Sequence, residues 1–461
     1  MKIVVCVRQG IDGAINPFDA CAYEEALKIE NAQVILLSMG PLSTKDFLWN
    51  LTRQGAEQAI LLSDSVFAGA DTLATAYALS LAIKKLSPDY VFCGRQTLIG
   101  DTAQTGPMLS VYADCSLVTN VMRIVDITDT QITCETREQG VQQVPALALI
   151  TVERINTLRL PRLRPKLGEL VVWSAQDIGA DYSRCGLKGS PTRVLKTFEN
   201  ASGKRKCRYI SPSELDEVLT AALKKQVGKV TPATRFVTPL KKVWIVGEDP
   251  MDFAKQVSDD IAVINRDTPQ AIADRIRAEK PNAVLWGSDA WSKQMSAQVA
   301  AMLHLGLCAD CTALETDGKT FIMYRPALSG RVLAKIISQT TPAMATVRAA
   351  KQGNDLMVAA GYGAKDCLDK VNRFAERYHA VQTATRKVVD NDLLPYEMQV
   401  GLTGKMVSPS VYVTFGVSGA VHHIVGMQQA GTVIAVNRDK DAPIFDYADY
   451  GIVADIEAVL S

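Results

Sequence analysis

An internal repeat restricts the fold of this chain more than any other feature of its sequence. The segment Pro88–Gly94 (PDYVFCG) resembles Pro281–Gly287 (PNAVLWG). Asp114 and Pro145 are 31 positions apart in the first copy, and Asp310 and Pro342 are 32 positions apart in the second. These residues belong to an Ala-Asp-Cys trio and a proline-led apolar segment, at Ala113–Cys115 with Pro145–Ala148 and at Ala309–Cys311 with Pro342–Ala345. Matching separations across three anchors predict two related domains in series.

The first copy alternates apolar strands with amphipathic helices. This β-α-β-α order is typical of a parallel, doubly wound sheet. The predicted strands are Lys2–Arg8, Gln33–Met39, Gln58–Leu62 and Tyr90–Gly94, and the predicted helices are Asp19–Glu30, Thr44–Gln54 and Asp71–Leu86.

The composition excludes several classes of protein. A chain of 461 residues is long enough for roughly two to four domains. Its 50 Lys and Arg residues balance 49 Asp and Glu residues, so we expect no nucleic-acid partner. The sequence has no run of 18 apolar residues and no signal-peptide pattern. We therefore expect no membrane insertion.

The ten cysteines are scattered along the chain, which argues against a disulfide framework and favours the cytoplasm. One Cys-x-x-Cys pair, Cys308 and Cys311, occurs without a second pair or histidines at ligand spacing. We therefore expect two buried thiols there and predict no metal site.

A polar loop follows the predicted strand that ends at Gly94. It runs to Pro107 and places Gly, Asp, Thr and Gln residues between a strand and a helix. Glycines allow close backbone approach and a helix N-terminus favours anions, so the loop suits a nucleotide. A well-capped loop without a ligand explains these residues equally well.

The segment between the two copies reads as an arm and linker with one predicted helix, Ser211–Lys225. Its basic cluster, Lys204–Arg208, is expected on the solvated surface, with docking against an acidic partner as the alternative. The predicted division is a nucleotide-binding domain at 1–178, the arm and linker at 179–239, a second α/β domain at 240–352 and a third domain at 353–461.

The C-terminal segment carries the richest chemistry. A strand at Val411–Phe415 leads into Gly416–Gly419 (GVSG), and a predicted helix with His422 and His423 follows. Backbone N–H groups, a serine hydroxyl and a helix dipole at that position can hold a pyrophosphate. The sequence shows no Ser-His-Asp order and no HExxH spacing, so hydrolysis is not expected.

Longer motifs resemble one family, the electron transfer flavoproteins. Three of them are similar to the FAD-binding domain of the α subunit: Gln399–Val407 (QVGLTGKMV), Gly416–Met427 (GVSGAVHHIVGM) and Val433–Ala454 (VIAVNRDKDAPIFDYADYGIVA). Five are similar to the β subunit: Asn16–Phe18, Tyr23–Ala26, Gly100–Pro107, Arg159–Pro161 and Leu187–Thr192. The resemblance covers almost the whole chain in the order β then α, so both subunits are expected in one polypeptide.

The resemblance implies an α/β fold. Two related doubly wound parallel-sheet domains, of the adenine nucleotide α-hydrolase-like kind, would precede a C-terminal Rossmann-like FAD-binding domain. The β subunit and the first α domain of that family share one fold, which agrees with the internal repeat.

The resemblance also implies roles around FAD. Arg386 would place its guanidinium near the isoalloxazine ring, and His423 would lie by the pyrimidine carbonyl. As the predicted catalytic pair they would stabilise the anionic one-electron-reduced flavin. A surface salt bridge is the alternative for Arg386. The other implied FAD contacts are Thr385, Val400, Gly401, Leu402 and Thr403 around the ring, Ser418, Gly419, Ala420 and Val421 at the pyrophosphate with His422 beside them, and Asn437 and Asp455 at the adenosine end.

The sequence departs from the family pattern in three places. Ala360–Gly363 (AGYG) stands where members usually have Gly-Gly-Arg-Gly, so an arginine is lost and Tyr362 is expected to replace it as a stacking contact. Leu402 stands where glutamine is common, and the first α domain is short at its start. We expect FAD binding to be retained, with a flavin potential that the resemblance does not define.

The β-type half would bind a second adenine nucleotide. In simple carriers of the family this nucleotide is AMP. Val66–Lys85 resembles the electron-bifurcating branch, in which the site holds another FAD that accepts hydride from NADH. We predict two FAD groups, with FAD plus AMP as the alternative. The implied contacts are Cys6, Asn16, Asp101, Thr102, Gln104 and Thr105.

The expected function is that of a cytoplasmic electron carrier. The implied partners are an acyl-CoA dehydrogenase of fatty acid β-oxidation or another flavoprotein dehydrogenase, a quinone- or ferredoxin-linked oxidoreductase, and NADH. The FAD-binding domain would swivel on a hinge near residues 349–355. The alternative from another class is a flavin-free adenine-nucleotide sensor or regulatory protein with the same fold.

Overall fold

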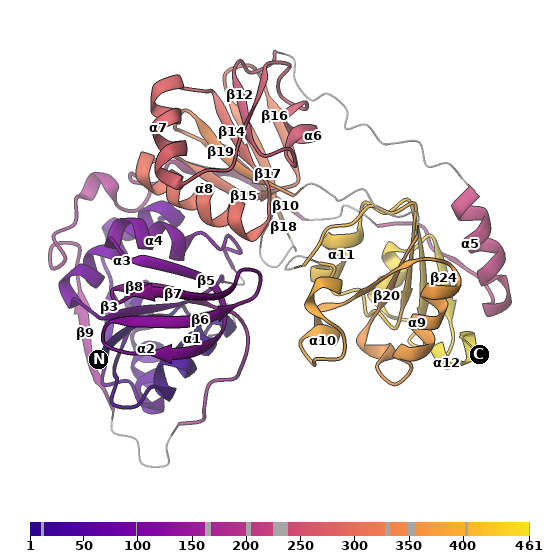
Figure 1. Cartoon of the computed structure of the whole chain (residues 1–461), viewed down its shortest axis with the longest axis horizontal. Coiled ribbons are helices and arrows are strands. Elements are labelled where there is room, and N and C mark those ends of the chain that lie inside the picture. Colours follow the sequence, from indigo (N-terminus) through magenta and orange to yellow (C-terminus); the bar gives the residue numbers. More distant parts are fainter. Residues whose placement is uncertain are drawn as a thin grey trace. The chain divides into compact units, whose positions relative to one another are not determined.

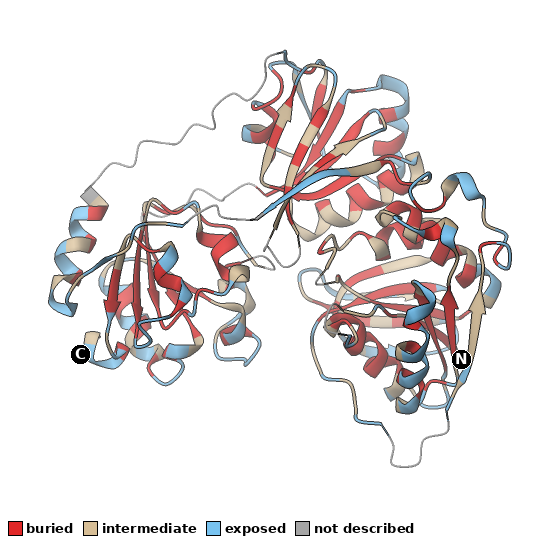
Figure 2. Ribbon diagram, turned by 180° about the vertical axis from the view of Figure 1, so that it is seen from behind, coloured by how far each residue is buried: buried red, intermediate tan, exposed pale blue. Residues whose placement is uncertain are grey.

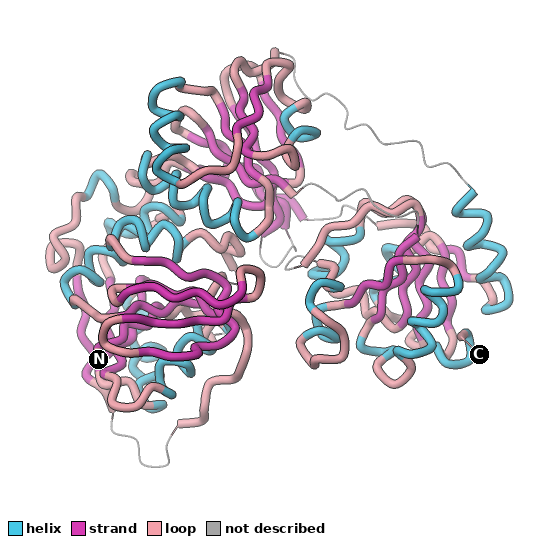
Figure 3. Tube along the Cα trace, viewed as in Figure 1, coloured by secondary structure: helices cyan, strands magenta, loops and turns pink. Residues whose placement is uncertain are grey.

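The computed structural model describes residues 1–10, 13–97, 99–161, 167–199, 204–224, 238–327, 332–348, 356–401 and 404–460. The chain forms two compact units (Figure 1). The first contains residues 1–197, 234–328 and 334–347, and the second contains residues 198–233, 329–333 and 348–461. Both are built from alternating strands and helices (Figure 3).

A nine-stranded sheet forms the N-terminal part of the first unit, in the order β7-β6-β5-β8-β4-β1-β2-β3-β9. The strands β5, β8, β4, β1, β2, β3 and β9 run parallel to one another. At one edge of the sheet, β6 and β7 are antiparallel. The strands are β1 (Lys2–Cys6), β2 (Gln33–Met39), β3 (Gln58–Leu62), β4 (Tyr90–Gly94), β5 (Ser116–Ile127), β6 (Gln131–Thr136), β7 (Gly140–Pro145), β8 (Ala148–Val152) and β9 (Glu169–Trp173). The helices are α1 (Pro17–Lys28), α2 (Lys45–Leu51), α3 (Thr72–Leu86) and α4 (Thr105–Ala113).

Helices cover both faces of this sheet, as a doubly wound fold requires. Val4 of β1 packs in one apolar cluster with residues of α3 and α4. Its neighbours Ile3 and Val5 pack in a second cluster with residues of α1 and α2. Successive side chains of a strand point to opposite faces, and a parallel sheet covered on both faces is therefore apolar throughout. This explains why the central strands read as continuous hydrophobic runs.

The rest of the first unit holds a second parallel sheet, in the order β13-β12-β14-β19-β15, and a four-stranded sheet, in the order β10-β18-β17-β16. The strands are β10 (Thr192–Glu199), β12 (Val243–Val246), β13 (Ile261–Ile264), β14 (Ala283–Trp286), β15 (Leu307–Cys311), β16 (Ala313–Thr316), β17 (Phe321–Ala327), β18 (Val332–Ser338) and β19 (Ala343–Val347). The helices are α6 (Met251–Ala254), α7 (Pro269–Glu279) and α8 (Ala290–Leu303).

The two parallel sheets of the first unit share one local irregularity. β5 shifts its register beside β8 around Asn120 (φ 58°), and β15 shifts beside β19 around Asp310 (φ 55°). The backbone N–H of Asn120 donates to Thr151 Oγ1 at 3.0 Å, and that of Asp310 donates to Thr346 Oγ1 at 2.8 Å. Such bulges are features of a particular fold, so the shared bulge supports the internal repeat.

One anchor of the predicted repeat was wrong. Asp114 caps α4 with φ 57°, whereas Asp310 lies inside β15. The residue that caps α8 in the way that Asp114 caps α4 is His304, with φ 53°. Both the helix end and the bulge need a left-handed residue, and Asp tolerates that conformation. The same three letters therefore occur at two different places in the two copies.

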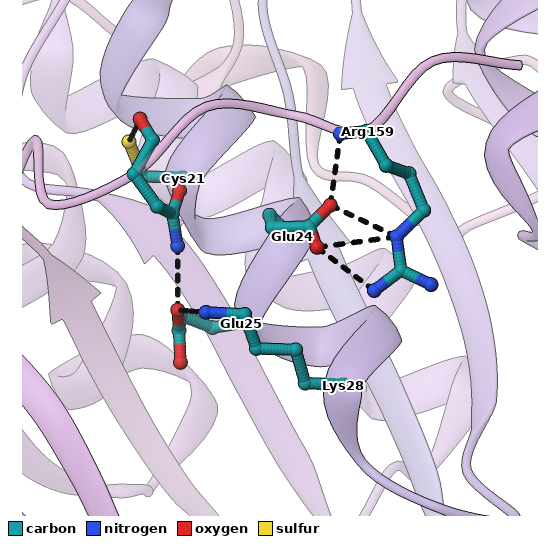
Figure 4. Close-up of polar contacts among 6 residues, drawn as sticks. Cys21, Glu24, Glu25, Lys28 and Arg159 are labelled. Carbon is teal, nitrogen blue, oxygen red and sulfur yellow. Dashed lines mark hydrogen bonds and ion pairs between the residues drawn. The ribbon is translucent and has the colours of Figure 1, made fainter.

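An ion-pair network fixes the chain that leaves β8 against α1 (Figure 4). Arg159 binds both carboxylate oxygens of Glu24 through its guanidinium, at 2.8–3.1 Å, and donates its backbone N–H to the same carboxylate. Burial opposes the charge on Glu24, but these hydrogen bonds hold the pKa of its carboxyl below the usual value. Beside it, Asn156 donates to Glu25 at 2.5 Å. Leu160, which follows Arg159 in the chain, is 87% exposed.

The second unit has a six-stranded parallel sheet in the order β11-β24-β23-β22-β20-β21. The strands are β11 (Arg208–Tyr209), β20 (Leu356–Ala360), β21 (Val381–Ala384), β22 (Val411–Phe415), β23 (Thr432–Asn437) and β24 (Tyr450–Val453). The helices are α5 (Leu215–Lys224), α9 (Leu368–Arg377), α10 (Arg386–Val389), α11 (Val421–Met427) and α12 (Ile456–Val459). Together the three parallel sheets confirm the predicted fold class.

The arm contributes to both units. β10 joins the four-stranded sheet of the first unit, while β11 and α5 pack on the second unit. Leu219 of α5 is fully buried. Much of the rest of α5 is exposed (Figure 2). Arg205 donates to the carbonyl oxygens of Gly431 at 2.9 Å and Ala430 at 2.5 Å, and it pairs with Asp449. The expectation of a solvated surface was therefore wrong for Arg205, whose side chain is 16% exposed.

The structure also bears on the Cys-x-x-Cys pair and on the expectation of no membrane insertion. Cys308 and Cys311 lie in β15 with both side chains buried, as predicted, and burial raises the pKa of Cys311. In the part of the chain that the structure describes, no helix has the length and apolarity needed to cross a membrane.

Replacing Arg205 with Ala should loosen the arm on the second unit, because the variant loses charge-assisted hydrogen bonds in a partly buried place. We expect the free energy of local opening of the arm to fall by about 2 kcal/mol, so that hydrogen exchange at the Ile210 amide becomes roughly thirtyfold faster. That amide donates to Gly451 O at 2.9 Å, across the β11–β24 pair. Arg208→Ala is the matched control, because its ion pair with Glu214 is long, at 3.9 Å, and exposed. Equal exchange rates in the two variants would refute the anchoring role of Arg205.

Candidate functional site

The second unit has its topological switch point between β20 and β22. The chain leaves β20 for β21 on one side of the sheet and returns to β22 on the other side. Ligands of open parallel sheets bind at such points, outside the carboxyl ends of the strands. Here the loop after β20 is Gly361–Ala364 and the loop after β22 is Gly416–Ala420.

Glycines allow the two loops to touch backbone to backbone. A Cβ atom on Gly361 would collide with the carbonyl oxygen of Gly416, and Gly416 has a left-handed φ of 65°. On the other side of the second loop, a Cβ on Gly419 (φ 87°) would collide with the backbone N of Ile444. No larger residue fits at these positions. The two loops therefore pack on each other through backbone atoms, and a glycine-rich turn of this kind at the start of a helix suits a phosphate.

The second loop also presents accessible groups. Ser418 and Ala420 are exposed, and Val421 and His422 at the start of α11 are half-buried. Val400, Gly401 and Gly419, which were predicted beside the same ligand, are buried. The predicted ring contacts Leu402 and Thr403 lie outside the described residues.

Cationic side chains gather at the ends of β20 and β21. Arg386 begins α10 directly after Thr385, whose backbone N–H donates to Ala360 O at 2.9 Å. The ammonium groups of Lys387 and Lys365 lie 4.2 and 5.3 Å from the ring centroid of Tyr362. Cation–π attraction therefore holds two lysines on the tyrosine that stands at the family's arginine position. The predicted stacking of Tyr362 on the flavin stays a prediction.

Arg386 forms a salt bridge, which was the alternative role given to it from the sequence, although its partner was not identified there. Its Nε donates to Asp390 Oδ2 at 3.1 Å, one helical turn later. The side chains are 19% and 33% exposed. The i, i+4 spacing of Arg and Asp in the sequence was the available signal.

His423 is buried and bonded at both ring nitrogens. Nδ1 lies 3.0 Å from Val400 O, and Nε2 lies 3.3 Å from the Tyr412 hydroxyl. A carbonyl oxygen only accepts, so Nδ1 carries the proton and Nε2 accepts from Tyr412. Burial lowers the pKa of His423 to about 4, although the hydrogen bond to Val400 opposes the shift. The imidazole is therefore neutral at physiological pH.

The predicted adenosine contacts occupy two neighbouring strand ends. Asn437 ends β23 and is buried, with its Nδ2 donating to Val417 O at 2.9 Å and its Oδ1 accepting from Asp439 N at 3.0 Å. Asp455 follows β24, is exposed and caps α12 by accepting from Glu457 N. Asn437 thus holds the Gly416–Ala420 loop from behind.

The first unit has an equivalent switch point between β1 and β4. The loops after these strands are joined, because Asn16 Nδ2 donates to Gln96 O at 2.9 Å and Gln96 Nε2 donates to Asp101 Oδ1 at 2.7 Å. All the residues predicted for the second nucleotide lie at this place, Cys6 at the end of β1, Asn16 before α1, and Asp101, Thr102, Gln104 and Thr105 between β4 and α4.

Gln104 carries the clearest sign of a missing ligand in this loop. Its side chain is 2% exposed, and neither its amide nitrogen nor its amide oxygen has a hydrogen-bond partner among the described residues. Asp101 and Ala103 just before it have φ values of 51° and 54°. Buried amides are almost always bonded, so an orphaned one beside two strained residues indicates that a polar group belongs there.

Two buried charged groups at this switch point were not predicted. Asp19 accepts from Arg8 N at 2.8 Å, and a Cβ on Gly94 would collide with its carboxylate. Burial raises the pKa of Asp19 to about 7, while hydrogen bonds from Asn16 and Arg8 oppose the shift. Glu153, after β8, pairs with Arg95 at 3.3 Å and Arg137 at 3.1 Å. A lone acid in an apolar helix face or strand end was the available signal for both.

The residues at both switch points suit a nucleotide phosphate or base. In the second unit this rests on the glycine loop after β22, on the exposed Ser418 and on the cations at the ends of β20 and β21. In the first unit it rests on the orphaned amide of Gln104. Among the described residues, no group of three His, Cys, Asp or Glu could hold a metal ion.

Comparisons with known proteins agree with this geometry. The model of the electron transfer flavoprotein domain matches residues 3–177 and 259–360, and that of the electron transfer flavoprotein FAD-binding domain matches residues 352–428. Protein FixA of Azorhizobium caulinodans is 39% identical over 242 residues, which cover 48% of this chain and 86% of that protein. The electron transfer flavoprotein subunit beta of Clostridium acetobutylicum is 39% identical over 201 residues, which cover 41% of this chain and 78% of that protein.

The raised pKa of Asp19 predicts a pH dependence of stability. The pKa of Asp19 is near 4 in the unfolded chain and about 7 in the folded protein, so the folded state binds more protons between these pH values. The contribution of Asp19 to the free energy of unfolding therefore falls as the pH rises from about 4 to about 7. Asp19→Asn removes that penalty. As the pH rises from 5 to 8, we expect the free energy of unfolding of the variant to increase by about 2–3 kcal/mol relative to that of the unaltered protein. Urea unfolding at each pH measures this difference. Asp46→Asn, at an exposed position of α2, is the control. Parallel stability curves for Asp19→Asn and the unaltered protein would contradict the buried acid.

Proposed function

The chain belongs to the electron transfer flavoprotein family, and we propose that it carries electrons between a flavoprotein dehydrogenase and a downstream acceptor through FAD bound at the switch point of its second unit. The observation that carries this proposal is the close backbone contact of the loops after β20 and β22 at the switch point of the sheet, which Gly361, Gly416 and Gly419 allow. When bound, FAD supplies a ring that takes up and releases electrons one or two at a time.

The residues of the second unit have distinct proposed tasks. The backbone of Ser418–Val421, with His422 beside it, holds the pyrophosphate, while Asn437 and Asp455 lie toward the adenosine. Val400, Gly401, Leu402, Thr403 and Thr385 border the ring. Arg386 supplies the positive charge next to it, because His423 is neutral at physiological pH. Thus His423 orients the Val400 backbone and Arg386 supplies the charge.

For the switch point of the first unit we propose a second FAD that accepts hydride from NADH, so that the protein splits the electron pair between two acceptors. The paired loops of Asn16, Gln96 and Asp101 and the orphaned amide of Gln104 support a nucleotide there. The similarity of the N-terminal half to FixA and to the β subunit supports the same location. FAD plus AMP is the competing occupancy.

The proposed partners follow from the task. The donor is an acyl-CoA dehydrogenase or another flavoprotein dehydrogenase in the cytoplasm, and the acceptor is a quinone- or ferredoxin-linked oxidoreductase. Keeping both nucleotide sites on one chain makes their pairing intramolecular, so their ratio is fixed. The proposed hinge near residues 349–355 lies outside the described residues.

The first test counts the cofactors. We expect the purified protein to show flavin absorbance and to release two FAD per chain, and anaerobic NADH to bleach that absorbance. One FAD plus one AMP, with no bleaching by NADH, would end the proposal for the first unit and leave the carrier. A bare protein spectrum after expression with ample riboflavin would instead favour the flavin-free nucleotide sensor.

Gln104→Met tests the second nucleotide directly. The substitution removes two buried polar atoms that have no partner among the described residues, so the nucleotide-free protein should lose no stability. The affinity of the nucleotide-free protein for FAD or AMP at this site should fall about tenfold or more, measured by calorimetry. Unchanged affinity would show that the Gln104 amide does not contact the nucleotide.

Arg386→Ala tests the charge beside the flavin. Loss of a cation close to the ring disfavours an added negative charge, so the potential of the first electron should fall by an amount corresponding to about tenfold in the equilibrium constant. Potentiometric titration measures the shift. Arg373→Ala is the matched control, since this arginine forms an exposed i, i+4 pair on α9. Equal potentials in both variants would remove Arg386 from the flavin.

A further inference from the structure

We propose that Asp390 is a positioning residue, which holds Arg386 at the crevice of the second unit and offsets part of its charge. In this way it sets how strongly the site attracts an electron. The proposal rests on the proposed function, which places Arg386 beside the flavin ring.

Two bonds within one turn tie Asp390 to Arg386. The guanidinium Nε donates to Asp390 Oδ2 at 3.1 Å, and the backbone N–H of Asp390 donates to Arg386 O at 2.8 Å. The turn is itself fixed, because Val388 is fully buried and Val389 nearly so. A long, flexible arginine side chain is thereby restrained at its Nε, which fixes the direction from which the rest of the guanidinium can approach a ligand.

Partial burial makes this pair more consequential than an ordinary surface pair. The side chains of Arg386 and Asp390 are 19% and 33% exposed, whereas those of Arg373 and Asp369, an Arg-Asp pair with the same spacing on α9, are 68% and 69% exposed. Charges on solvated side chains are screened, and pairs withdrawn from water interact more strongly. The chain therefore contains its own matched comparison.

The surrounding charge explains why a carboxylate is useful at this position. Lys387 follows Arg386 directly, and Lys365 joins it over the ring of Tyr362. Three cations thus stand at the ends of β20 and β21, and Asp390 is the carboxylate that contacts the arginine. An electron adds negative charge to a bound flavin, and uncompensated cations nearby favour that addition. Asp390 moderates this effect.

The decisive variant is Asp390→Asn, which removes one negative charge and nearly keeps the shape. With this carboxylate's negative charge removed from the guanidinium, the equilibrium constant for adding the first electron should rise about tenfold, which equals 59 mV for one electron. Potentiometry of the flavin-loaded protein measures this. Asp369→Asn, with the same change of net charge, should shift the constant less than twofold, and Asp390→Glu should restore it to within about threefold. The dissociation constant of FAD from the flavin-free protein should change less than about threefold.

A double-variant cycle shows whether Asp390 acts through Arg386. In the Arg386→Ala background, Asp390→Asn should shift the equilibrium constant by no more than about threefold. An equal shift in both backgrounds, or none in the unaltered protein, overturns the role of Asp390. These results differ from a failure of the proposed function, which would appear as an Arg386→Ala variant with an unaltered potential.

Discussion

The contact between the backbones of Gly361 and Gly416 is the constraint on which the rest of the second unit depends. Two loops can meet over a parallel sheet only where the strand order reverses, and here they meet without any side chain between them. Under the proposed function, the backbone of the Gly416–Ala420 loop is the surface that binds the pyrophosphate. This role also explains why the loop is held from behind, by Asn437 on Val417 O and by Ile444 N on Ser418 O. A cradle made of backbone has no side chain to exclude the wrong ligand, so selectivity must come from the groups around it, such as Arg386 and the lysines on Tyr362.

The two related domains of the first unit carry different polar groups at equivalent helix starts. Both copies share the bulge at Asn120 and Asp310, so their strand ends are built alike. In the second copy, however, Asp289 caps α8 and pairs with Arg266 at 2.8 Å. A carboxylate at this helix start repels a phosphate. In the first copy Gln104 stands at the start of α4 with an unbonded amide. Under the proposed function, these polar groups, and not the shared fold, favour the first copy as the nucleotide site.

Sequence reasoning predicted the parallel strands well, because continuous apolar runs separated by amphipathic helices have few alternative structures. The strand at Val411–Phe415 and its glycine loop were predicted at the bounds that the structure shows. The same reasoning misplaced the Ala-Asp-Cys anchor, since left-handed backbone is needed at both a helix end and a bulge. It also missed Asp390, although the i, i+4 spacing from Arg386 was a local signal. Asp19 and Glu153 were missed because their significance depends on burial and, for Glu153, on Arg95, which lies 58 positions earlier in the chain. Long-range charge pairing leaves no local pattern in a sequence.

The state of His423 decides where the positive charge of the crevice must come from. A neutral imidazole has one N–H, and Val400 O occupies it, so this side chain can reach a pyrimidine carbonyl only by releasing that bond. Release is not prohibitive, because exchanging one hydrogen bond for another costs little, about 1 kcal/mol or less. Tyr412 would lose nothing, since Thr383 Oγ1 lies 3.3 Å from its hydroxyl as a second partner. In the flavin-free protein, where burial lowers the pKa of His423 to about 4, the imidazole offers a hydrogen bond without a positive charge. Under the proposed function, the electrostatic attraction for an electron therefore rests on the cations at the ends of β20 and β21, and Asp390 acts on the flavin through the arginine that it contacts.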